Sequence, residues 1–348
     1  MRKKIVSFIG PPFSGKSTII GRILVDLKQV GKRGIEDAQR DAQALGYSSY
    51  YSLLVNFELN ERLSGHTLGI KFIDVTLGER RLLLLDTPGS IQGLTDVLTA
   101  LIVSDATVLV LNRSNEKLWA FYNCLLDLLR ISQKIVVSSE GSDIREGSSG
   151  IIKVLKGTEE GIEEIINFLS TIKERMRLKD ILRMPIIGTY GMGNVAYGVI
   201  TRGKVRVGDE IILTPVYRVG IVSSIEQDQR PLEKAVAGDD IGISFRGIGR
   251  QYIKRGYVIS APERLPKKLK EARIEVVWKS SELKEGISII ACIHSAQVPC
   301  KIIRKMKDEL ILKFEREVCA EPYETDIELG TVLLRDHEKP LCIGKILS

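Results

Sequence analysis

Hydrophobic and polar residues follow two different patterns along the chain, and the change comes near residue 180. In the first part, short apolar runs that suit buried strands alternate with longer stretches that suit helices. The predicted strands are 5–9, 70–75, 81–85, 106–111 and 134–137, and the predicted helices are 17–30, 118–131 and 161–169. This alternation predicts an α/β fold in which helices cover both faces of a parallel sheet.

From residue 186 onward, the chain consists of short β runs that glycines separate at regular intervals. The turns at 190–193, 201–204 and 237–240 are examples, and such even punctuation is typical of a β-barrel. The segment 260–268 combines two prolines with charged residues, which predicts a linker between two β domains. The predicted domains are 1–178 (α/β), 182–262 (β-barrel) and 270–348 (β-barrel).

Composition narrows the class of protein. A chain of 348 residues is long enough for two or three domains. No apolar run reaches the ~18 residues that a membrane helix needs, and the apolar start of the chain breaks at 10–12 without a signal-peptide cleavage segment. The 5 cysteines lack the spacing of a zinc site or of a secreted disulfide scaffold. We therefore expect a cytoplasmic, monomeric protein with reduced thiols and no membrane partner.

The net charge of +7 is concentrated in the middle of the chain, where residues 181–262 hold 11 basic and 7 acidic side chains. Such an excess permits contact with RNA phosphates, but it is also common in proteins that bind no nucleic acid. Charge alone therefore leaves an RNA partner open.

A glycine-rich loop directly after the first predicted strand matches the phosphate-binding P-loop pattern. Its sequence is Gly10-Pro11-Pro12-Phe13-Ser14-Gly15-Lys16-Ser17, and a predicted helix follows. In such a loop the backbone N–H groups and the helix N-terminus face a phosphate, the lysine reaches the terminal phosphates and the serine ligates Mg²⁺. The alternative is a glycine-rich turn with an incidental lysine, which the strand–loop–helix context disfavours. The predicted nucleotide-binding residues here are Gly10, Phe13, Ser14, Gly15, Lys16, Ser17 and Thr18.

A second motif, Asp86-Thr87-Pro88-Gly89, ends the apolar run 82–85. In a nucleotide site, Asp86 would hold the Mg²⁺ shell and the backbone N–H of Gly89 would reach the γ-phosphate. The alternative for Asp86 is a turn or capping residue beside Pro88. Because a P-loop lies upstream, we predict that Asp86 and Gly89 bind the nucleotide and that Asp86 serves the metal.

With these motifs the chain resembles the translational GTPase superfamily, of the elongation factor 1-alpha and Tu type, over nearly all its length. The segment 61–67, Glu-Arg-Leu-Ser-Gly-His-Thr, is similar to the family's first switch segment, although alone it would read as a polar loop. The resemblance implies that Thr67 joins Ser17 and Asp86 as a metal ligand in the GTP state. The turns in 198–210 and 237–242 are similar to the family's second domain, and 294–300 is similar to its third, where we expect His294 to be a packed structural residue.

The resemblance implies a P-loop GTPase domain followed by two β-barrels, with GTP or GDP and Mg²⁺ as cofactors. It also implies aminoacyl-tRNA and the ribosome as partners, and no DNA. The compact first domain resembles archaeal SelB-like elongation factors more than elongation factor 1-alpha.

Three departures from the family pattern limit what the resemblance implies. Ser90 occupies the position of the histidine that orients the hydrolytic water, which leaves the catalytic residue unknown and predicts slow hydrolysis. The guanine-reading motif is reduced to Glu140-Gly141-Ser142-Asp143, in which Asp143 survives as a predicted base contact or, alternatively, as an ordinary loop residue. Barely a dozen residues separate 134–137 from the segment 150–157, which holds the last base-contact loop, so a crossover helix there must be missing or tiny. Leu155 and Lys156 are the predicted contacts in that loop.

Asp240 falls where the family has an asparagine, near the pocket for the aminoacyl group. It is a candidate for an altered aminoacyl preference, and the alternative is that it stabilises a β-turn.

Three function classes follow from the sequence. The first is a GTP-dependent carrier of an aminoacyl-tRNA, possibly a specialised one. The second is a regulatory or assembly protein that keeps the scaffold and has lost turnover. The third is a metabolic enzyme on the same scaffold, such as the GTPase subunit of sulfate adenylyltransferase, which the lack of a separate catalytic constellation disfavours.

Overall fold

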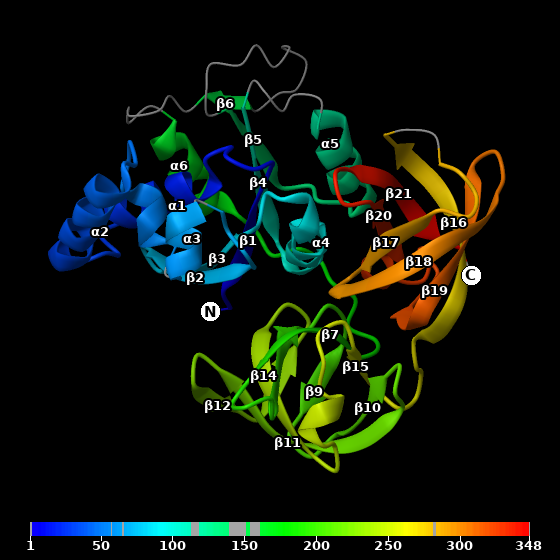
Figure 1. Ribbon diagram of the computed structural model, residues 1–348. Helices are drawn as coiled ribbons and strands as arrows, with labels where there is room; N and C mark the ends of the chain where they lie inside the picture. Colours follow the sequence, from blue (N-terminus) through cyan, green and yellow to red (C-terminus); the bar gives the residue numbers. More distant parts are fainter. Residues whose placement is uncertain are drawn as a thin grey trace. The chain divides into compact units, whose positions relative to one another are not determined.

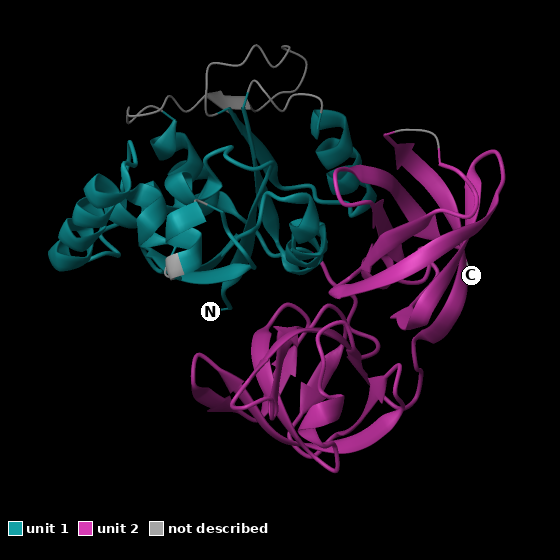
Figure 2. Ribbon diagram, viewed as in Figure 1, with its two compact units in different colours: residues 1–175 teal, residues 176–348 magenta. Residues whose placement is uncertain are grey.

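The computed structural model describes residues 2–56, 58–64, 66–112, 118–138, 151–153, 161–280 and 283–347. The chain divides into two compact units, residues 1–175 and 176–348 (Figure 2). Unit 1 holds the predicted α/β domain, and unit 2 holds both predicted β domains. The three-domain boundaries of the sequence analysis remain predictions.

Unit 1 is built on a six-stranded sheet with the order β2-β3-β1-β4-β5-β6 (Figure 1). Its strands are β1 (Lys4–Ile9), β2 (Lys71–Leu77), β3 (Arg80–Asp86), β4 (Ala106–Leu111), β5 (Lys134–Ser138) and β6 (Ile151–Lys153). All neighbours pair in parallel except β2, which runs antiparallel to β3. The central strands are buried on both faces, which is why they read as continuous apolar runs in the sequence.

Helices cover both faces of this sheet, as predicted. The helices are α1 (Lys16–Asp26), α2 (Lys32–Leu45), α3 (Leu59–Ser64), α4 (Leu94–Val103), α5 (Trp119–Leu128) and α6 (Ile162–Thr171), with 3₁₀ turns η1 (Tyr51–Leu54) and η2 (Ile91–Gly93). α1 and α6 share one apolar core with alternate residues of the strands, such as Val6 and Phe8. α4 and α5 lie on the opposite face (Figure 1).

The predicted helices 17–30 and 118–131 are too long, because their chains leave the helix after Asp26 and Leu128. Lys28 and Arg130 then adopt positive φ, which ends each helix. The predicted short crossover leads to β6, which pairs in parallel with β5 through Val137 and Ile152. The connecting residues 139–150 lie outside the described part of the chain.

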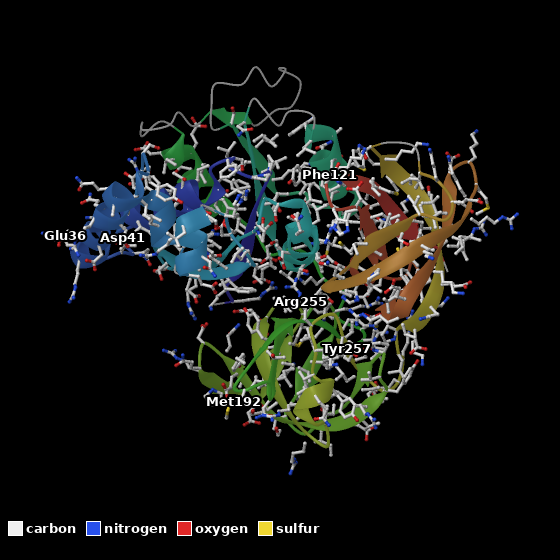
Figure 3. All side chains as sticks on the ribbon, viewed as in Figure 1. Glu36, Asp41, Phe121, Met192, Arg255 and Tyr257 are labelled. Carbon is white, nitrogen blue, oxygen red and sulfur yellow. The ribbon has the colours of Figure 1, made fainter. Side chains whose placement is uncertain are left out.

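α2 is attached to unit 1 by a narrow contact. Only Ala38 and Ala42 are buried, and they pack against η1. The other faces of α2 are polar, and Glu36 and Asp41 lie on it (Figure 3). An ion pair between Arg62 and Asp41 connects α2 with α3.

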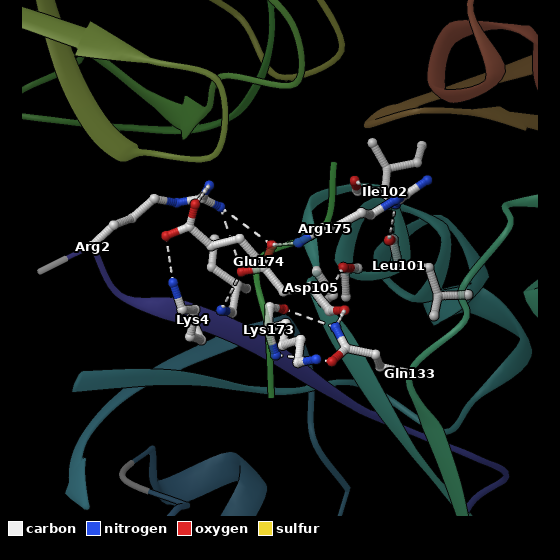
Figure 4. Close-up of polar contacts among 12 residues, drawn as sticks. Arg2, Lys4, Leu101, Ile102, Asp105, Gln133, Lys173, Glu174 and Arg175 are labelled. Atoms are coloured by element: carbon white, nitrogen blue, oxygen red, sulfur yellow. Dashed lines mark hydrogen bonds and ion pairs between the residues drawn. The ribbon is translucent and has the colours of Figure 1, made fainter. Parts of the chain in front are cut away.

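Asp105, between α4 and β4, accepts hydrogen bonds that anchor the last residues of unit 1 (Figure 4). Its buried carboxylate accepts hydrogen bonds from the backbone N–H of Ile5 at 2.9 Å and of Arg175 at 3.0 Å. Gln133 exchanges two hydrogen bonds of 2.8 Å with the backbone of Lys173. These contacts hold the segment after α6 at the amino-terminal ends of β1 and β4 and leave their carboxyl-terminal ends to the P-loop.

The first β domain of unit 2 contains nine strands. They are β7 (Arg183–Tyr190), β8 (Val195–Val199), β9 (Lys204–Arg206), β10 (Glu210–Thr214), β11 (Arg218–Gln227), β12 (Arg230–Leu232), β13 (Lys234–Val236), β14 (Asp240–Arg246) and β15 (Val258–Ser260), with a 3₁₀ turn η4 (Arg250–Tyr252). Six of them follow the order β10-β15-β7-β8-β14-β11, and β11 pairs again with β10. The ring of strands therefore returns on itself, as the barrel prediction requires.

The second β domain is a closed barrel with the order β16-β19-β18-β17-β20-β21. Its elements are β16 (Lys267–Lys279), β17 (Ser288–Ile293), β18 (Ala296–Lys305), β19 (Glu309–Ala320), α7 (Ile327–Gly330), β20 (Thr331–Arg335) and β21 (Pro340–Ile346). Alternate residues of β18 point into the core, as the period of a strand requires. The predicted linker 260–268 is shorter than expected, because Lys267 already pairs with Ala320.

Buried polar contacts join the two β domains within unit 2. Arg183 of β7 lies 3.1 Å from the Glu321 carboxylate and donates to the carbonyl oxygen of Arg264 at 2.9 Å.

His294 is fully buried, and its Nε2 donates to the carbonyl oxygen of Cys319 at 2.9 Å. Burial lowers the pKa of His294 to about 4. The prediction that His294 is a packed structural residue is confirmed.

Two expectations from composition concern the whole chain. None of the 5 cysteines, which all lie in the described part of the chain, forms a disulfide. Among the described residues, no helix has both the length and the apolar character needed to cross a membrane.

Candidate nucleotide-binding site

Two glycines fix the path of the predicted P-loop between β1 and α1. Gly10 has a φ of 145°, and a Cβ on it would overlap the carbonyl oxygen of Val110. Gly89, after β3, lies so close to the loop that a Cβ would come within 2.6 Å of the Pro11 backbone. The backbone that follows β3 therefore packs directly on the loop, and only glycine fits at both positions.

Lys16 is the first residue of α1, and its ammonium group is folded back onto the loop. Its Nζ donates to the carbonyl oxygens of Gly10 at 3.0 Å and Pro11 at 2.8 Å, with Ser14 Oγ at 3.4 Å. Burial lowers the pKa of Lys16 to about 8, and the charge of Asp86 partly opposes this shift. A phosphate in the loop would offer this buried cation an anionic partner in place of neutral carbonyl oxygens.

The three predicted metal ligands come together at the ends of α1 and β3. Ser17 Oγ donates to Asp86 Oδ2 at 2.7 Å, and Thr67 Oγ1 lies 3.3 Å from Ser17 Oγ and 3.4 Å from Asp86 Oδ2. These residues come from three separate segments, so the fold confirms that they are neighbours.

The donor set fits a small hard cation. Asp86 is fully buried, burial raises its pKa, and its Oδ1 has no hydrogen-bond partner among the described residues. A buried carboxylate oxygen without a partner is costly unless a cation balances it. Mg²⁺ prefers oxygen ligands and takes one or two carboxylates besides water and phosphate. Among the described residues, no three His, Cys, Asp or Glu side chains lie close enough together to hold a metal ion between them.

The segment that carries Thr67 is anchored by a buried ion pair that the sequence did not reveal. Glu61 of α3 pairs with Lys71, the first residue of β2, and also accepts a hydrogen bond from the Leu68 N–H at 2.9 Å. Lys71 Nζ donates to Asn56 Oδ1 at 2.7 Å. The pair closes the chain on both sides of Thr67, and no local pattern in the sequence signals it.

Phe13 and His66 form a second contact between the loop and this segment. Phe13 has a φ of 57° and its side chain is 69% exposed. Its ring centroid lies 4.7 Å from that of His66, at an interplanar angle of 55°. Thr18, also predicted to bind the nucleotide, is the third residue of α1 and half-buried.

Ser90 lies at the start of η2, directly after the Asp86–Gly89 motif. It is half-buried, and its carbonyl oxygen accepts a hydrogen bond from the Gly93 N–H at 3.0 Å. That Ser90 replaces the family's water-orienting histidine remains a prediction.

The remaining predicted residues lie elsewhere. Asp143, Leu155 and Lys156 fall outside the described residues. Asp240 begins β14 in unit 2, where its buried side chain accepts a hydrogen bond from Gln227 Nε2 at 2.7 Å. This contact supports the alternative of a structural role for Asp240, and its part in an aminoacyl pocket remains a proposal.

Comparison with known proteins identifies the fold, and the matches cover most of the chain. The elongation factor Tu GTP binding domain matches residues 1–138, and elongation factor Tu domain 2 matches residues 193–260. Elongation factor 1-alpha of Saccharolobus solfataricus is 25% identical to this chain over an alignment of 420 residues. The alignment covers 98% of this chain and 95% of that protein.

Two solved structures share the fold at low identity. Translation elongation factor SelB from Methanococcus maripaludis, in complex with the GTP analogue GppNHp, aligns with a TM-score of 0.70 and 18% identity, over 100% of this chain and 80% of its own. The S. cerevisiae Ski7 GTPase-like domain bound to GTP aligns with a TM-score of 0.74 and 14% identity, over 99% of this chain and 97% of the Ski7 chain. The two domain matches together cover more than half of the chain, so it belongs to the translational GTPases of the elongation factor Tu and 1-alpha type.

Proposed function

We propose that this elongation-factor-like GTPase binds GTP and GDP with Mg²⁺ at the carboxyl-terminal ends of β1 and β3. We further propose that its GTP form carries an aminoacyl-tRNA, of a specialised kind, to the ribosome in the cytoplasm. The main support for the nucleotide site is that Ser17, Thr67 and Asp86 lie together, and that one buried oxygen of the Asp86 carboxylate has no hydrogen-bond partner among the described residues.

In this proposal, the loop N–H groups and Lys16 hold the terminal phosphates, and Gly89 adds a backbone N–H. Ser17, Thr67 and Asp86 hold Mg²⁺, which when bound would draw negative charge from the phosphates. Ser17 and Asp86 come from rigid elements, whereas Thr67 comes from the segment that the Glu61–Lys71 pair anchors. Asp143, Leu155 and Lys156 are proposed to contact the guanine base.

The tRNA partner is supported by family membership and by the second unit. Elongation factor 1-alpha relatives match 98% of the chain, and unit 2 supplies two barrels of the kind the family places beside its GTPase domain. The fold is also shared, at 17% identity, with a bacterial selenocysteine-specific elongation factor, EF-Sec, which supports a specialised aminoacyl group. Asp240 is the candidate residue for that preference.

Ser90 supports slow hydrolysis, and it also supports a second candidate function. A hydroxyl cannot carry the positive charge of a protonated imidazole at the water-orienting position. The same residue would suit a regulatory protein that binds nucleotide without turnover, and the fold is shared with a domain described as GTPase-like, that of Ski7. The second candidate therefore predicts nucleotide binding without ribosome-stimulated hydrolysis.

The test is whether the GTP form protects the ester of aminoacyl-tRNA. Protein with GTP is mixed with total aminoacylated tRNA, and the loss of labelled amino acid is followed for each tRNA by sequencing the protected pool. The carrier function predicts slower deacylation of one or a few tRNAs in GTP than in GDP. The Lys16→Ala variant is the control, because it should protect none. Equal deacylation with and without the protein, despite bound GTP, would favour the regulatory candidate.

A further inference from the structure

An imidazole lies at the mouth of the P-loop although the usual position holds Ser90. The chain has 3 histidines, and two of them, His294 and His337, belong to unit 2. His66 is the remaining one, and it precedes the proposed metal ligand Thr67 directly. Its ring packs against Phe13 in the middle of the P-loop, with 4.7 Å between ring centroids.

His66 is held from both sides. On one side, its backbone N–H donates to Ser64 Oγ at 3.2 Å, and Thr67 Oγ1 lies within 3.4 Å of Asp86 Oδ2. On the other side, Phe13 presents its ring from a backbone with a φ of 57°. A bulky residue in this left-handed region is strained. The loop therefore bears strain at the residue that receives the imidazole, and strain of this kind often accompanies function.

The contact leaves the polar edge of the His66 ring available. Within the described residues, the His66 side chain contacts the Phe13 ring, and neither of its ring nitrogens has a hydrogen-bond partner. By contrast, the ring of His294 is buried and bonded to the backbone of Cys319. A half-buried imidazole with unused nitrogens beside a phosphate loop can hold a water molecule.

We propose that His66 orients the water that attacks GTP and so takes the part that Ser90 cannot play. This proposal rests on the proposed GTP site. In the step, the water oxygen bonds to the γ-phosphorus while the bond from that phosphorus to the β–γ bridging oxygen breaks. The electron pair leaves with GDP, and the water proton ends on the released inorganic phosphate. His66 holds the water by accepting a hydrogen bond through a ring nitrogen, and Phe13 keeps the ring in place.

A purely structural role for His66 makes a different prediction. If the ring only packs on Phe13 to order the segment around Thr67, a leucine of similar size would replace it, and a glutamine would do worse. If the ring nitrogen holds water, glutamine retains a hydrogen-bonding group and leucine does not. The two variants therefore separate hydrogen bonding from packing.

The experiment measures single-turnover hydrolysis of bound GTP and, separately, the affinity for a fluorescent GDP analogue. We expect His66→Leu to slow hydrolysis about tenfold or more, where positioned general acid–base groups contribute about 10²–10⁴-fold, with affinity changed less than about threefold. His66→Gln should lose less, and adding Ser90→His to His66→Leu should restore turnover. Leu68→Ala is the matched control, since its side chain is 59% exposed in the same segment, and it should hydrolyse GTP at the wild-type rate.

Three results would overturn the role of His66. They are a His66→Leu rate equal to that of the wild type, equal losses in His66→Leu and His66→Gln, and a wild type that binds GTP and never hydrolyses it. Failure of the wild type to bind the GDP analogue would instead overturn the proposed function. The affinity measurement thus distinguishes the two failures.

Discussion

Ser17 and Asp86 are 69 residues apart in the chain and share a hydrogen bond of 2.7 Å between Oγ and Oδ2. The bond joins the first turn of α1 to the last residue of β3. The Ser17 hydroxyl donates its proton to the Asp86 carboxylate that we propose for Mg²⁺. For a cation to bind, the Ser17 hydroxyl oxygen and the Asp86 carboxylate oxygen must therefore both turn towards it. The same movement would bear on Thr67, which lies within 3.4 Å of both side chains. We therefore expect metal binding to be coupled to the position of the segment that carries Thr67.

Asp86→Asn tests this coupling because it keeps the shape of the side chain and removes its charge. We expect Mg²⁺ to strengthen GTP binding by the wild type and to leave the variant almost unaffected, with a loss of at least about tenfold, equal to about 1.4 kcal/mol. Titrations of a fluorescent GTP analogue in Mg²⁺ and in EDTA measure it. An asparagine variant that keeps the full Mg²⁺ effect would show that the metal is held elsewhere.

Lys16→Ala should abolish measurable nucleotide binding without unfolding the protein. The substitution removes the cation that faces the phosphates, and charge-assisted hydrogen bonds of this kind are worth about 1.5–3 kcal/mol each. Calorimetric titration with GDP and a thermal melt of the same sample provide the two measurements. Lys28→Ala, which changes an exposed lysine just beyond α1, is the control and should bind like the wild type. Unchanged affinity in Lys16→Ala would contradict the P-loop assignment.

The sequence predicted the sheet of unit 1 well and its helices less well. Buried parallel strands are continuous apolar runs, so β1, β3 and β4 were placed within a residue or two. α4 was missed because all ten of its residues are buried, which removes the apolar-polar period that marks a surface helix. α2 was missed for the opposite reason, since only two of its residues reach the core.

In the site too, motifs that are contiguous in the sequence could be predicted, and contacts between distant segments could not. The P-loop and the Asp86–Gly89 motif are contiguous in sequence, so their roles could be proposed from spacing. The Glu61–Lys71 pair and the Phe13–His66 contact join segments that are separate in the chain. Neither contact has a sequence pattern, and only the fold brings the partners together.

Ser90→His should raise the rate of GTP hydrolysis. The substitution places an imidazole where the family has one, and general acid–base or water-orienting groups contribute about 10²–10⁴-fold when their geometry is right. Because η2 was not built around a histidine, we expect the lower part of that range or less, about tenfold. Single-turnover hydrolysis with and without ribosomes measures it. A wild-type rate as high as that of an efficient factor would mean that Ser90 imposes no penalty.

His294 should make the second barrel sensitive to acid. Burial lowers its pKa to about 4 from an unfolded value of 6.5, so between these values the unfolded chain binds a proton that the folded chain excludes. The free energy of unfolding therefore falls as the pH falls from about 6.5 to 4, by ~3 kcal/mol over the whole window. In His294→Gln, the amide can still donate to Cys319 and this contribution disappears.

Denaturant unfolding at several pH values tests the effect of His294. Trp278 lies in β16, and in a Trp119→Phe background it is the sole tryptophan, so its fluorescence reports on the second barrel. The wild-type and His294→Gln curves should converge or cross as the pH falls through the window. Parallel pH dependence in the two proteins would show that His294 does not titrate with unfolding.

The last prediction concerns selectivity for guanine, for which the sequence keeps one residue of the usual motif. Asp143 lies outside the described residues, but a carboxylate there would accept hydrogen bonds from the N1–H and N2–H₂ groups of guanine, and adenine offers no such pair. A bidentate contact to a base edge is worth about 1–3 kcal/mol in protein–DNA complexes, which as a scale implies a preference for GDP over ADP of roughly ten- to a hundredfold.

Asp143→Ala should remove most of this preference and leave the affinity for the phosphates, because Lys16 and the P-loop are unchanged. Ser142→Ala, one residue earlier, is the matched control and should keep the preference. Competition titrations with GDP and ADP against a fluorescent GDP analogue measure both ratios. Equal dissociation constants of the wild type for GDP and ADP would refute guanine recognition. The chain would then be a nonselective nucleotide-binding member of its family, because the phosphate loop binds what every nucleoside diphosphate shares.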